Sequence, residues 1–347
     1  MVLWCVSLLT RSVSTLIKLP CQVHWVYPYD KLRSANVLST LTVIDLASTG
    51  KPKSLVFVSS TSAIDTEHYV QLSDSLSVNS PRGGIPESDD LEGARHSLKT
   101  GYGQTKWVSE KLLLEAGRRG LSGRIVRPGY VVGDSKSAGG CSSLRYVLLL
   151  TSPSAYLVTN TDDFIWRMVK GCVQLGLVPD INNTINMVPV DHVALCTSLA
   201  AVSPASAPLS VLHITARPLP TFNDLLSSLA QYGFLTEQCE YLVWRRKLEQ
   251  HVMEVQDNAL FPLLHFVLDD LPTSTKAPEL DDSNTAALLR SNNCVENVTV
   301  SEQLMGRYLS WLVNAKFLSV PSMSKPEKPL PLMVNGKVLK AVGRSGS

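Results

Sequence analysis

Two short apolar runs constrain the fold of this chain more than any other feature of its sequence. The first is Ser-Leu-Val-Phe-Val-Ser at 54–59, and the second is Gly-Arg-Ile-Val-Arg-Pro at 123–128. Runs of this length are typical of strands buried on both faces of a parallel sheet. The segments 29–46 and 102–117, which precede them, carry apolar residues at helical spacing. This alternation of helix and strand predicts an α/β fold with a doubly wound parallel sheet.

The first apolar run ends in four consecutive hydroxyl side chains, at Ser59, Ser60, Thr61 and Ser62. In open parallel sheets, the carboxyl ends of the strands carry the binding and catalytic groups. The hydroxyls therefore predict a functional site at this edge of the sheet. A polar loop without a function is the alternative, because Ser and Thr are also common in turns.

Tyr102 and Lys106 form the second candidate feature. They are four residues apart within the segment Thr-Gly-Tyr-Gly-Gln-Thr-Lys, so on a helix they share one face. An ammonium group near a phenol lowers the pKa of the tyrosine from its ordinary value of about 10. The tyrosine can then act as a general acid or base towards a carbonyl or alcohol oxygen. On spacing alone, a half-buried tyrosine beside a solvated lysine is the more common origin of such a pair.

The remaining segments complete the predicted organisation. We expect a long polar surface loop at 65–100, a strand at 211–215, and a helix that begins after Thr221. Amphipathic helices are predicted at 243–269 and 301–314, where apolar residues recur at helical spacing.

Composition excludes several classes of function. The 347 residues are 44% hydrophobic and 18% charged with a net charge of +2, which is typical of a globular protein and predicts neither nucleic-acid nor membrane binding. Seven scattered cysteines form no Cys-x-x-Cys pair, so we expect no metal site and a reducing, cytoplasmic location. Arg11 and Lys18 interrupt the apolar N-terminus, which is therefore too polar to span a membrane.

Taken together, these features resemble the extended short-chain dehydrogenase/reductase superfamily. More narrowly, the chain resembles the C-terminal thioester reductase domain of the fungal L-2-aminoadipate reductase family. Each matching stretch is weak alone, but their number and order make the resemblance specific. The stretches are 24–29, 32–37, 57–67, 101–110, 125–134, 159–164, 179–183 and 188–193.

The resemblance implies a reaction and a catalytic set. The family uses NADPH to reduce a phosphopantetheine-bound 2-aminoadipyl thioester to 2-aminoadipate 6-semialdehyde, a step of lysine biosynthesis. In that scheme Tyr102 donates a proton to the carbonyl oxygen, and Lys106 holds the nicotinamide ribose and lowers the tyrosine pKa. A hydroxyl at the strand edge binds the same oxygen. We assign that hydroxyl to Ser60, with Thr61 as the alternative.

The resemblance also implies how the cofactor and the substrate are held. Arg127, Pro128 and Gly129 are expected to run past the nicotinamide, whereas Asp191 is interpreted as structural. The substrate would be presented by an acyl carrier domain that bears the phosphopantetheine arm. No metal takes part in this scheme.

Two departures from the family pattern shape the expectations for this chain. The superfamily opens with a strand, a Gly-x-x-Gly-x-x-Gly loop and a helix that together hold the cofactor pyrophosphate. The first glycine here is Gly50, so we expect an N-terminally truncated, incomplete Rossmann-like sheet without its first strands and glycine loop. Residues 139–157 interrupt the resemblance and contain an apolar run. We interpret them as translated non-coding sequence such as a retained intron, with a lid over the substrate as the alternative.

The family resemblance and the two departures from it predict the domain organisation. We expect an unmatched segment at 1–22, and a partial Rossmann-like reductase domain at 23–215 that includes the insertion at 139–157. A mostly helical substrate subdomain at 216–320 and a loose tail at 321–347 would follow. Two alternatives to the reductase function remain: an inactive fragment of that enzyme, and another extended short-chain reductase or epimerase.

Overall fold

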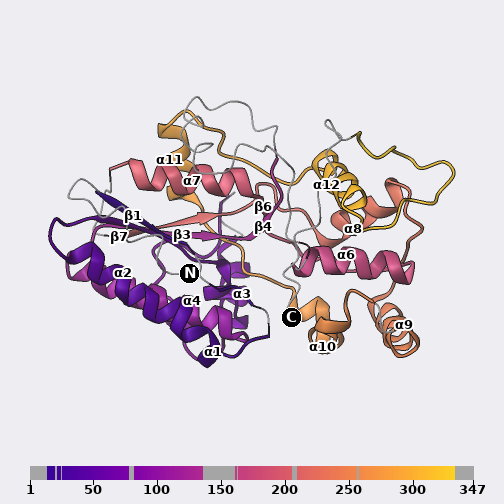
Figure 1. Cartoon of the computed structure of the whole chain (residues 1–347), viewed down its shortest axis with the longest axis horizontal. Helices are drawn as coiled ribbons and strands as arrows, with labels where there is room; N and C mark the ends of the chain where they lie inside the picture. The colour runs from indigo at the N-terminus through magenta and orange to yellow at the C-terminus, as the bar shows by residue number, and fades with distance from the viewer. Residues whose placement is uncertain are drawn as a thin grey trace.

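The computed structural model comprises a layered sheet domain with a helical lobe beside it (Figure 1). The expected insertion at 139–157 lies outside the described residues. The structure describes residues 14–19, 22–24, 26–77, 82–135, 161, 163–204, 209–255 and 258–332.

Four parallel strands form the central sheet, in the order β1-β2-β3-β7. Their bounds are Thr15–Lys18 for β1, Ser54–Val58 for β2, Gly123–Pro128 for β3 and Leu209–Ile214 for β7. The first strand belongs to the segment that we expected to lie outside the resemblance, and it pairs with β2 from Thr15↔Ser54 to Lys18↔Phe57.

Helices cover both faces of this sheet, as Figure 1 shows. Side chains alternate along a strand, and Leu55 and Phe57 of β2 therefore pack in one hydrophobic cluster while Val56 packs in another. The first cluster lies under α2 (Ser39–Ser48) and α4 (Gly101–Arg118), and the second lies under α7 (Val190–Val202) and α11 (Ser283–Ser291). The prediction of a doubly wound parallel sheet is confirmed.

A nearly continuous helical segment precedes β2. It consists of α1 (Tyr29–Arg33), a π-helical turn (Ser34–Leu38) and α2. Within the π-helical turn, Asn36 is buried and its amide donates hydrogen bonds to the Gln22 carbonyl and the Thr105 hydroxyl. The helix expected over 29–46 is present, and Asn36 fixes it against α4.

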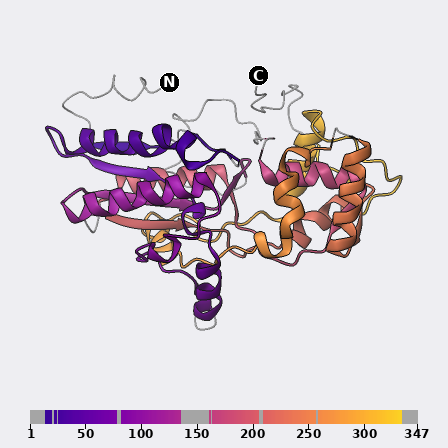
Figure 2. The same cartoon turned by 90° about the horizontal axis from the view of Figure 1, so that it is seen from below.

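The expectation of an unstructured surface loop at 65–100 is wrong over its first part, because α3 spans Glu67–Ser77 and projects from the sheet domain (Figure 2). A short 3-10 turn follows at Glu92–Ala94. Most of α3 is exposed, but Tyr69 is buried and its hydroxyl donates a hydrogen bond to Asp89. Tyr69, Leu72 and Leu76 lie at helical spacing in the sequence, but the polar composition of 65–100 led us to expect a loop.

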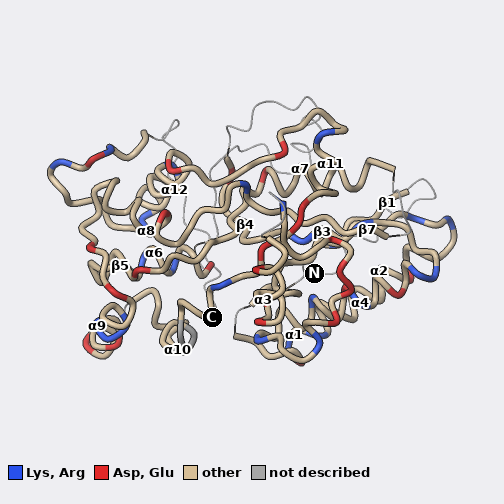
Figure 3. Tube along the Cα trace, turned by 180° about the vertical axis from the view of Figure 1, so that it is seen from behind, with Lys and Arg blue, Asp and Glu red and all other residues tan. Residues whose placement is uncertain are grey.

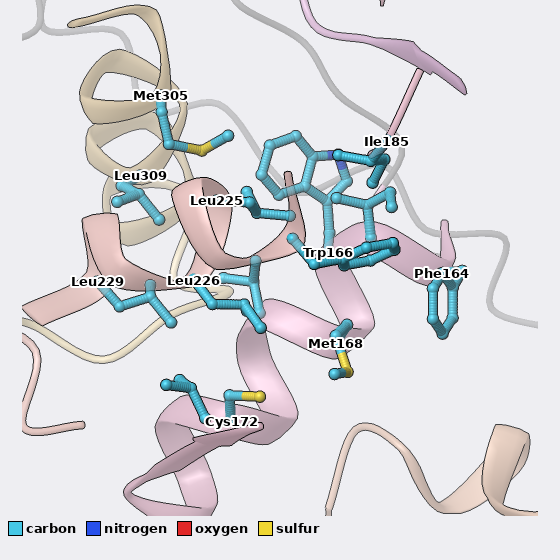
Figure 4. Close-up of a cluster of buried hydrophobic side chains, with 14 of the residues drawn as sticks. Phe164, Trp166, Met168, Cys172, Ile185, Leu225, Leu226, Leu229, Met305 and Leu309 are labelled. Atoms are coloured by element: carbon cyan, nitrogen blue, oxygen red, sulfur yellow. The ribbon is translucent and has the colours of Figure 1, made fainter. Parts of the chain in front are cut away.

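The helical lobe has its own hydrophobic core. It contains α6 (Phe164–Leu175), α8 (Phe222–Gln231), α9 (Tyr241–Glu254), α10 (Leu264–Ser274) and α12 (Glu302–Asn314). The single helix expected over 243–269 is two helices, α9 and α10, and the helix expected at 301–314 is α12. A two-stranded parallel sheet of β5 (Leu177–Pro179) and β8 (Glu237–Cys239) packs beside them. Figure 4 shows part of this core, with side chains of α6, α8 and α12 in mutual contact.

The lobe is assembled from both sides of the boundary expected near residue 215. Both α6 and β5 precede that boundary and pack in the lobe, whereas α11 follows it and covers the sheet. A second small pair, β4 (Tyr130–Val132) and β6 (Met187–Pro189), connects the sheet domain to the lobe. Charges of both signs are interspersed along the chain, as Figure 3 shows.

Glu87 fastens the polar segment after α3 to the sheet domain. Its carboxylate accepts hydrogen bonds from the backbone N–H groups of His213, at 2.7 Å, and Asn284, at 2.6 Å. The Thr285 hydroxyl donates a third, at 3.2 Å. Burial nevertheless raises the pKa of Glu87 from 4.5 to about 7, although the three hydrogen bonds oppose this change.

We expect Glu87 to make the folded state less stable as pH rises from about 5 to about 7. In this window the folded chain keeps a proton that the unfolded chain has released, so the free energy of unfolding falls as pH rises. In the parent, this titration should lower the free energy of unfolding by up to about 3 kcal/mol between the two ends of the window. Glu87→Gln should abolish that decrease, which urea unfolding at both pH values measures.

The comparison of the variant with the parent isolates Glu87, because the lowered pKa of buried His213, about 3, produces a pH dependence of the opposite sign. Glu67→Gln, on the exposed surface of α3, is the matched control and should leave the pH dependence unchanged. Parallel curves for the parent and Glu87→Gln would contradict this assignment.

Candidate active site

A cavity of about 280 Å³ lies at the carboxyl ends of β2 and β3. Residues 58–62 and 128–131 line it from the sheet domain. Residues 184–186, between β5 and β6, line it together with Phe222 of α8. The cavity therefore lies where an open parallel sheet is expected to carry its site. The hydroxyl edge predicted from the sequence forms one of its walls.

Tyr102 enters the cavity from the first turn of α4. Thr100 caps this helix, since its hydroxyl accepts a hydrogen bond from the Gly103 N–H at 3.0 Å. A Cβ atom at Gly103 would lie 2.6 Å from the Ser62 carbonyl oxygen, so only glycine allows this turn to approach the hydroxyl edge so closely. Sequence and packing together place the phenol against the strand edge.

Ser60 is the edge hydroxyl that meets Tyr102. Ser60 interacts with the Tyr102 phenol and lowers its pKa, and the Ser60 and Ser62 hydroxyls are hydrogen-bonded at 3.1 Å. Thr61 lines the same cavity. The contact with Tyr102 favours Ser60 over Thr61 as the partner hydroxyl.

The net pKa of Tyr102 lies above its ordinary value in this structure, whereas the sequence led us to expect a value below it. Burial raises the pKa of Tyr102 above its ordinary value of 10, and the Ser60 hydrogen bond offsets only part of the increase. The Lys106 ammonium lies 5.6 Å from the centre of the Tyr102 ring. The phenol is therefore held protonated, which is the state that a proton donor requires.

Lys106 is buried beneath the cavity, with 2% of its surface exposed. Its ammonium group donates a hydrogen bond to the Val58 carbonyl oxygen at 2.8 Å and lies 4.8 Å from the centre of the Phe57 ring. The cation is therefore fixed next to the carboxyl end of β2. It is not among the residues that line the cavity.

The three residues expected to run past a nicotinamide have different surroundings. Pro128 and Gly129 line the cavity. The Arg127 side chain is fully buried, and its Nη2 atom lies 2.7 Å from Oε2 of Glu110. The guanidinium therefore faces the interior between α4 and the sheet, and only the backbone of this segment continues to the cavity.

Asp191, interpreted from the sequence as structural, accepts hydrogen bonds from the Ser135 N–H at 3.0 Å and the Ser135 hydroxyl at 2.6 Å. These bonds fix the first turn of α7 against the segment after β4. The contacts agree with the structural interpretation.

Two carboxyl groups of the cavity, Asp65 and Asp163, were given no role from the sequence. Both fall in stretches that carry the family resemblance, and that was the only available signal. Burial raises the pKa of Asp65 above its ordinary value and that of Asp163 to about 6. Both carboxylates also raise the pKa of the half-buried Tyr130 phenol.

The family of the chain follows from its match to known proteins. The family model described as Male sterility protein, an NAD-binding domain, matches residues 6–197. The chain therefore belongs to this family, and the nicotinamide class of cofactor follows. The match begins well before His24, inside the segment expected to be unmatched.

Among curated proteins, the chain is similar to fungal L-2-aminoadipate reductases, which confirms the narrower resemblance. It is 48% identical to the enzyme of Schizosaccharomyces pombe over 98% of this chain and 23% of that protein. It is 45% identical to the large subunit from Penicillium chrysogenum over 93% of this chain and 22% of that protein. The chain thus spans about a quarter of the length of these relatives.

Solved structures show the same fold. The terminal R domain of the myxalamid PKS-NRPS pathway is 28% identical, with a TM-score of 0.69, over 87% of this chain and 68% of that one. A thiolation-reductase di-domain of an archaeal non-ribosomal peptide synthetase has a TM-score of 0.66 at 17% identity, over 88% of this chain and 58% of that one. Across the described residues, no helix is both long and apolar enough to cross a membrane.

Proposed function

We propose that this chain is an NADPH-dependent reductase that converts a phosphopantetheine-bound 2-aminoadipyl thioester into 2-aminoadipate 6-semialdehyde. The observation that carries the proposal is that Ser60 and Tyr102 line the same wall of the cavity and that Ser60 acts on the Tyr102 phenol. The similarity to L-2-aminoadipate reductases of 48% and 45% identity supports the acyl group.

The two hydroxyls are placed to act on a single oxygen atom. A carbonyl oxygen that approaches Ser60 and Tyr102 can accept a hydrogen bond from each, and these bonds strengthen as negative charge develops on the oxygen. Tyr102 then transfers its phenolic proton to that oxygen. The resulting thiohemiacetal forms the aldehyde when its C–S bond breaks and the pantetheine thiol leaves. The buried Lys106 ammonium, 5.6 Å from the ring centre, favours the tyrosinate that remains.

The residues around this pair fit a nicotinamide ring. Val58, Pro128 and Val131 provide apolar walls for a flat ring, and the Ser60 and Tyr102 hydroxyls lie in the same cavity. When bound, the reduced nicotinamide supplies the hydride. The contribution of the chain is to hold the ring and the carbonyl together, to limit the access of water and to deliver the proton.

The partner that presents the substrate is part of the same proposal. The similar solved structures include a thiolation-reductase di-domain, which supports an acyl carrier domain with a phosphopantetheine thioester as the source of the acyl group. Cys172, Cys196 and Cys294 are buried thiols, which suits a reducing compartment and supports a cytoplasmic location.

The proposal is tested by incubating the purified chain with NADPH and a 2-aminoadipyl pantetheine thioester. We expect NADPH to bind with micromolar affinity and to be consumed, with one aldehyde formed per thioester. Consumption is followed by the absorbance of NADPH, and the aldehyde is trapped and identified by mass spectrometry. The amide analogue of the thioester, which resists reduction, is the control for unproductive oxidation of NADPH.

Two results would overturn this proposal. The first is absent or millimolar binding of NADPH, measured by calorimetry. The second is micromolar binding without consumption of the thioester. A faster reaction with NADH than with NADPH would support the proposed thioester reduction but would show that NADH is the cofactor.

A further inference from the structure

The cavity brings together two carboxyl groups that are far apart in the sequence. Asp65 follows the 3-10 turn Thr61–Ile64 after β2, and Asp163 is the N-cap residue of α6. One therefore belongs to the sheet domain and the other to the helical lobe. Both line the cavity into which Tyr102 projects.

Among the residues that the structure describes, neither carboxyl group forms an ion pair. Within the described residues, Asp65 makes no hydrogen bond or ion pair, and the attraction of Lys99 is outweighed by the effect of burial on its pKa. Asp163 accepts one hydrogen bond, from the Ile165 N–H at 3.0 Å. Helix capping accounts for that bond but not for the charge, because asparagine caps a helix equally well.

The two carboxyl groups also act on a common group. Each raises the pKa of the Tyr130 phenol, which lines the same cavity. A desolvated carboxylate without a counterion is destabilising, and an incoming cation would compensate for its lost hydration. Apolar residues, including Val131, Ile185 and Phe222, form other parts of the wall, and they suit methylene groups.

We propose that Asp65 and Asp163 recognise a protonated amine on the acyl chain whose thioester carbonyl reaches Tyr102. This inference rests on the proposed reductase function and narrows its substrate to acyl groups that carry an ammonium. The apolar wall holds the methylene chain between the two ends. Asp65 and Asp163 are specificity-determining residues, and the hydroxyl pair carries out the proton transfer.

The test compares binding of three pantetheine amides, which resist reduction: 2-aminoadipyl, N-acetyl-2-aminoadipyl and adipyl. The last two lack the positive charge, and the adipyl chain is otherwise the same as the first. We expect calorimetry to show about 10- to 100-fold tighter binding of the amine, as for a charge-assisted hydrogen bond. This comparison uses the unaltered chain and needs no variant.

The variants Asp65→Asn and Asp163→Asn assign the preference to residues. Each variant should bind the 2-aminoadipyl amide about 10-fold more weakly and the adipyl amide as tightly as the parent does. The ratio of the two affinities should therefore fall about 10-fold. Asn keeps the cap on α6, so the second variant should stay folded. Asp45→Asn, which removes the same charge from the exposed surface of α2, is the matched control and should keep the full preference.

The outcomes separate this inference from the proposed function. Equal binding of the three amides by the unaltered chain overturns the inference, as does equal weakening of all three in both Asp variants. Reduction of the corresponding thioesters in that situation would leave the reductase intact. Clearly tighter binding of the 2-aminoadipyl amide without any reduction of the thioester would support the inference and contradict the proposed reductase function.

Discussion

Replacing Tyr102 by phenylalanine is expected to lower the rate of thioester reduction by about 10²- to 10⁴-fold, the usual contribution of general acid catalysis. The variant lacks only the hydroxyl that donates the proton. The Ser60 hydroxyl remains, so binding of the carbonyl oxygen is weakened rather than lost. The affinity for NADPH should stay nearly unchanged, because the ring that packs against Lys106 is kept.

The experiment measures single-turnover reduction at saturating NADPH, together with NADPH affinity. Tyr232→Phe is the matched control. It removes a hydroxyl that donates to the Glu302 carbonyl oxygen in the helical lobe, and it should leave the rate unchanged. A rate for Tyr102→Phe within a factor of two of the parent would remove Tyr102 from the mechanism.

The raised pKa of Tyr102 adds a pH dependence to the same prediction. Because burial holds this pKa above 10, the proton donor is present throughout the neutral and mildly alkaline range. We expect no loss of rate from ionisation of Tyr102 below about pH 9. An alkaline fall centred near neutrality that disappears in Tyr102→Phe would show that the phenol ionises early.

The predictions that succeeded depend on local patterns. The two apolar runs gave strands at almost the expected bounds, since a continuous run of Val, Leu and Ile fits a strand buried on both faces. The spacing of Tyr102 and Lys106 on α4 and the cap at Thr100 are also local. The hydroxyl edge followed from the rule that parallel strands present their carboxyl ends at one edge of the sheet.

The features that the sequence did not reveal depend on contacts between distant segments. Burial of Tyr102 comes from packing of α4 against the turn at 60–62, and it reverses the expected direction of the pKa change. Asp65 and Asp163 come from different parts of the fold, and no spacing rule joins them. The boundary expected near 215 ignored α6, whose apolar residues pack in a lobe built mainly from later helices.

The contacts of Arg127 also join distant segments, and they lead to the second large effect that we expect, a loss of stability when its ion pair with Glu110 is broken. Its Nε atom donates to both carboxylate oxygens of Glu110, at 3.1 and 2.8 Å, and Nη1 lies 2.9 Å from Nε2 of His213. The Ser59 hydroxyl donates to Oε1 of Glu110 at 2.5 Å. The ion pair of Arg127 and Glu110 therefore connects α4, β3, β7 and the hydroxyl edge through one buried network.

The imidazole of His213 completes this network as a neutral group. Burial and the neighbouring Arg127 cation lower the pKa of His213 to about 3. Its Nδ1 atom lies 2.7 Å from the Asp281 carbonyl oxygen, which can only accept. The proton is therefore assigned to Nδ1, and Nε2 accepts from Arg127.

Glu110→Gln and Arg127→Met should each lower the free energy of unfolding by about 3–5 kcal/mol, because either change leaves the other member of a fully buried ion pair without its partner charge. The double variant should cost clearly less than the sum, since no uncompensated charge remains. Urea unfolding of the four proteins measures the coupling between the two positions. The corresponding changes at the exposed pair of Glu115 and Arg119, on the same helix, should have little effect.

The helix that carries Tyr102 is attached to the sheet through this pair, so the single variants should also lower the rate of reduction at temperatures where they remain folded. The loss of rate should be smaller than in Tyr102→Phe, because no reacting group is removed. Additive costs in the double variant would show that Glu110 and Arg127 stabilise the fold independently. That result would leave the position of Tyr102 to the other contacts of α4, among them the Thr100 cap and the close packing at Gly103.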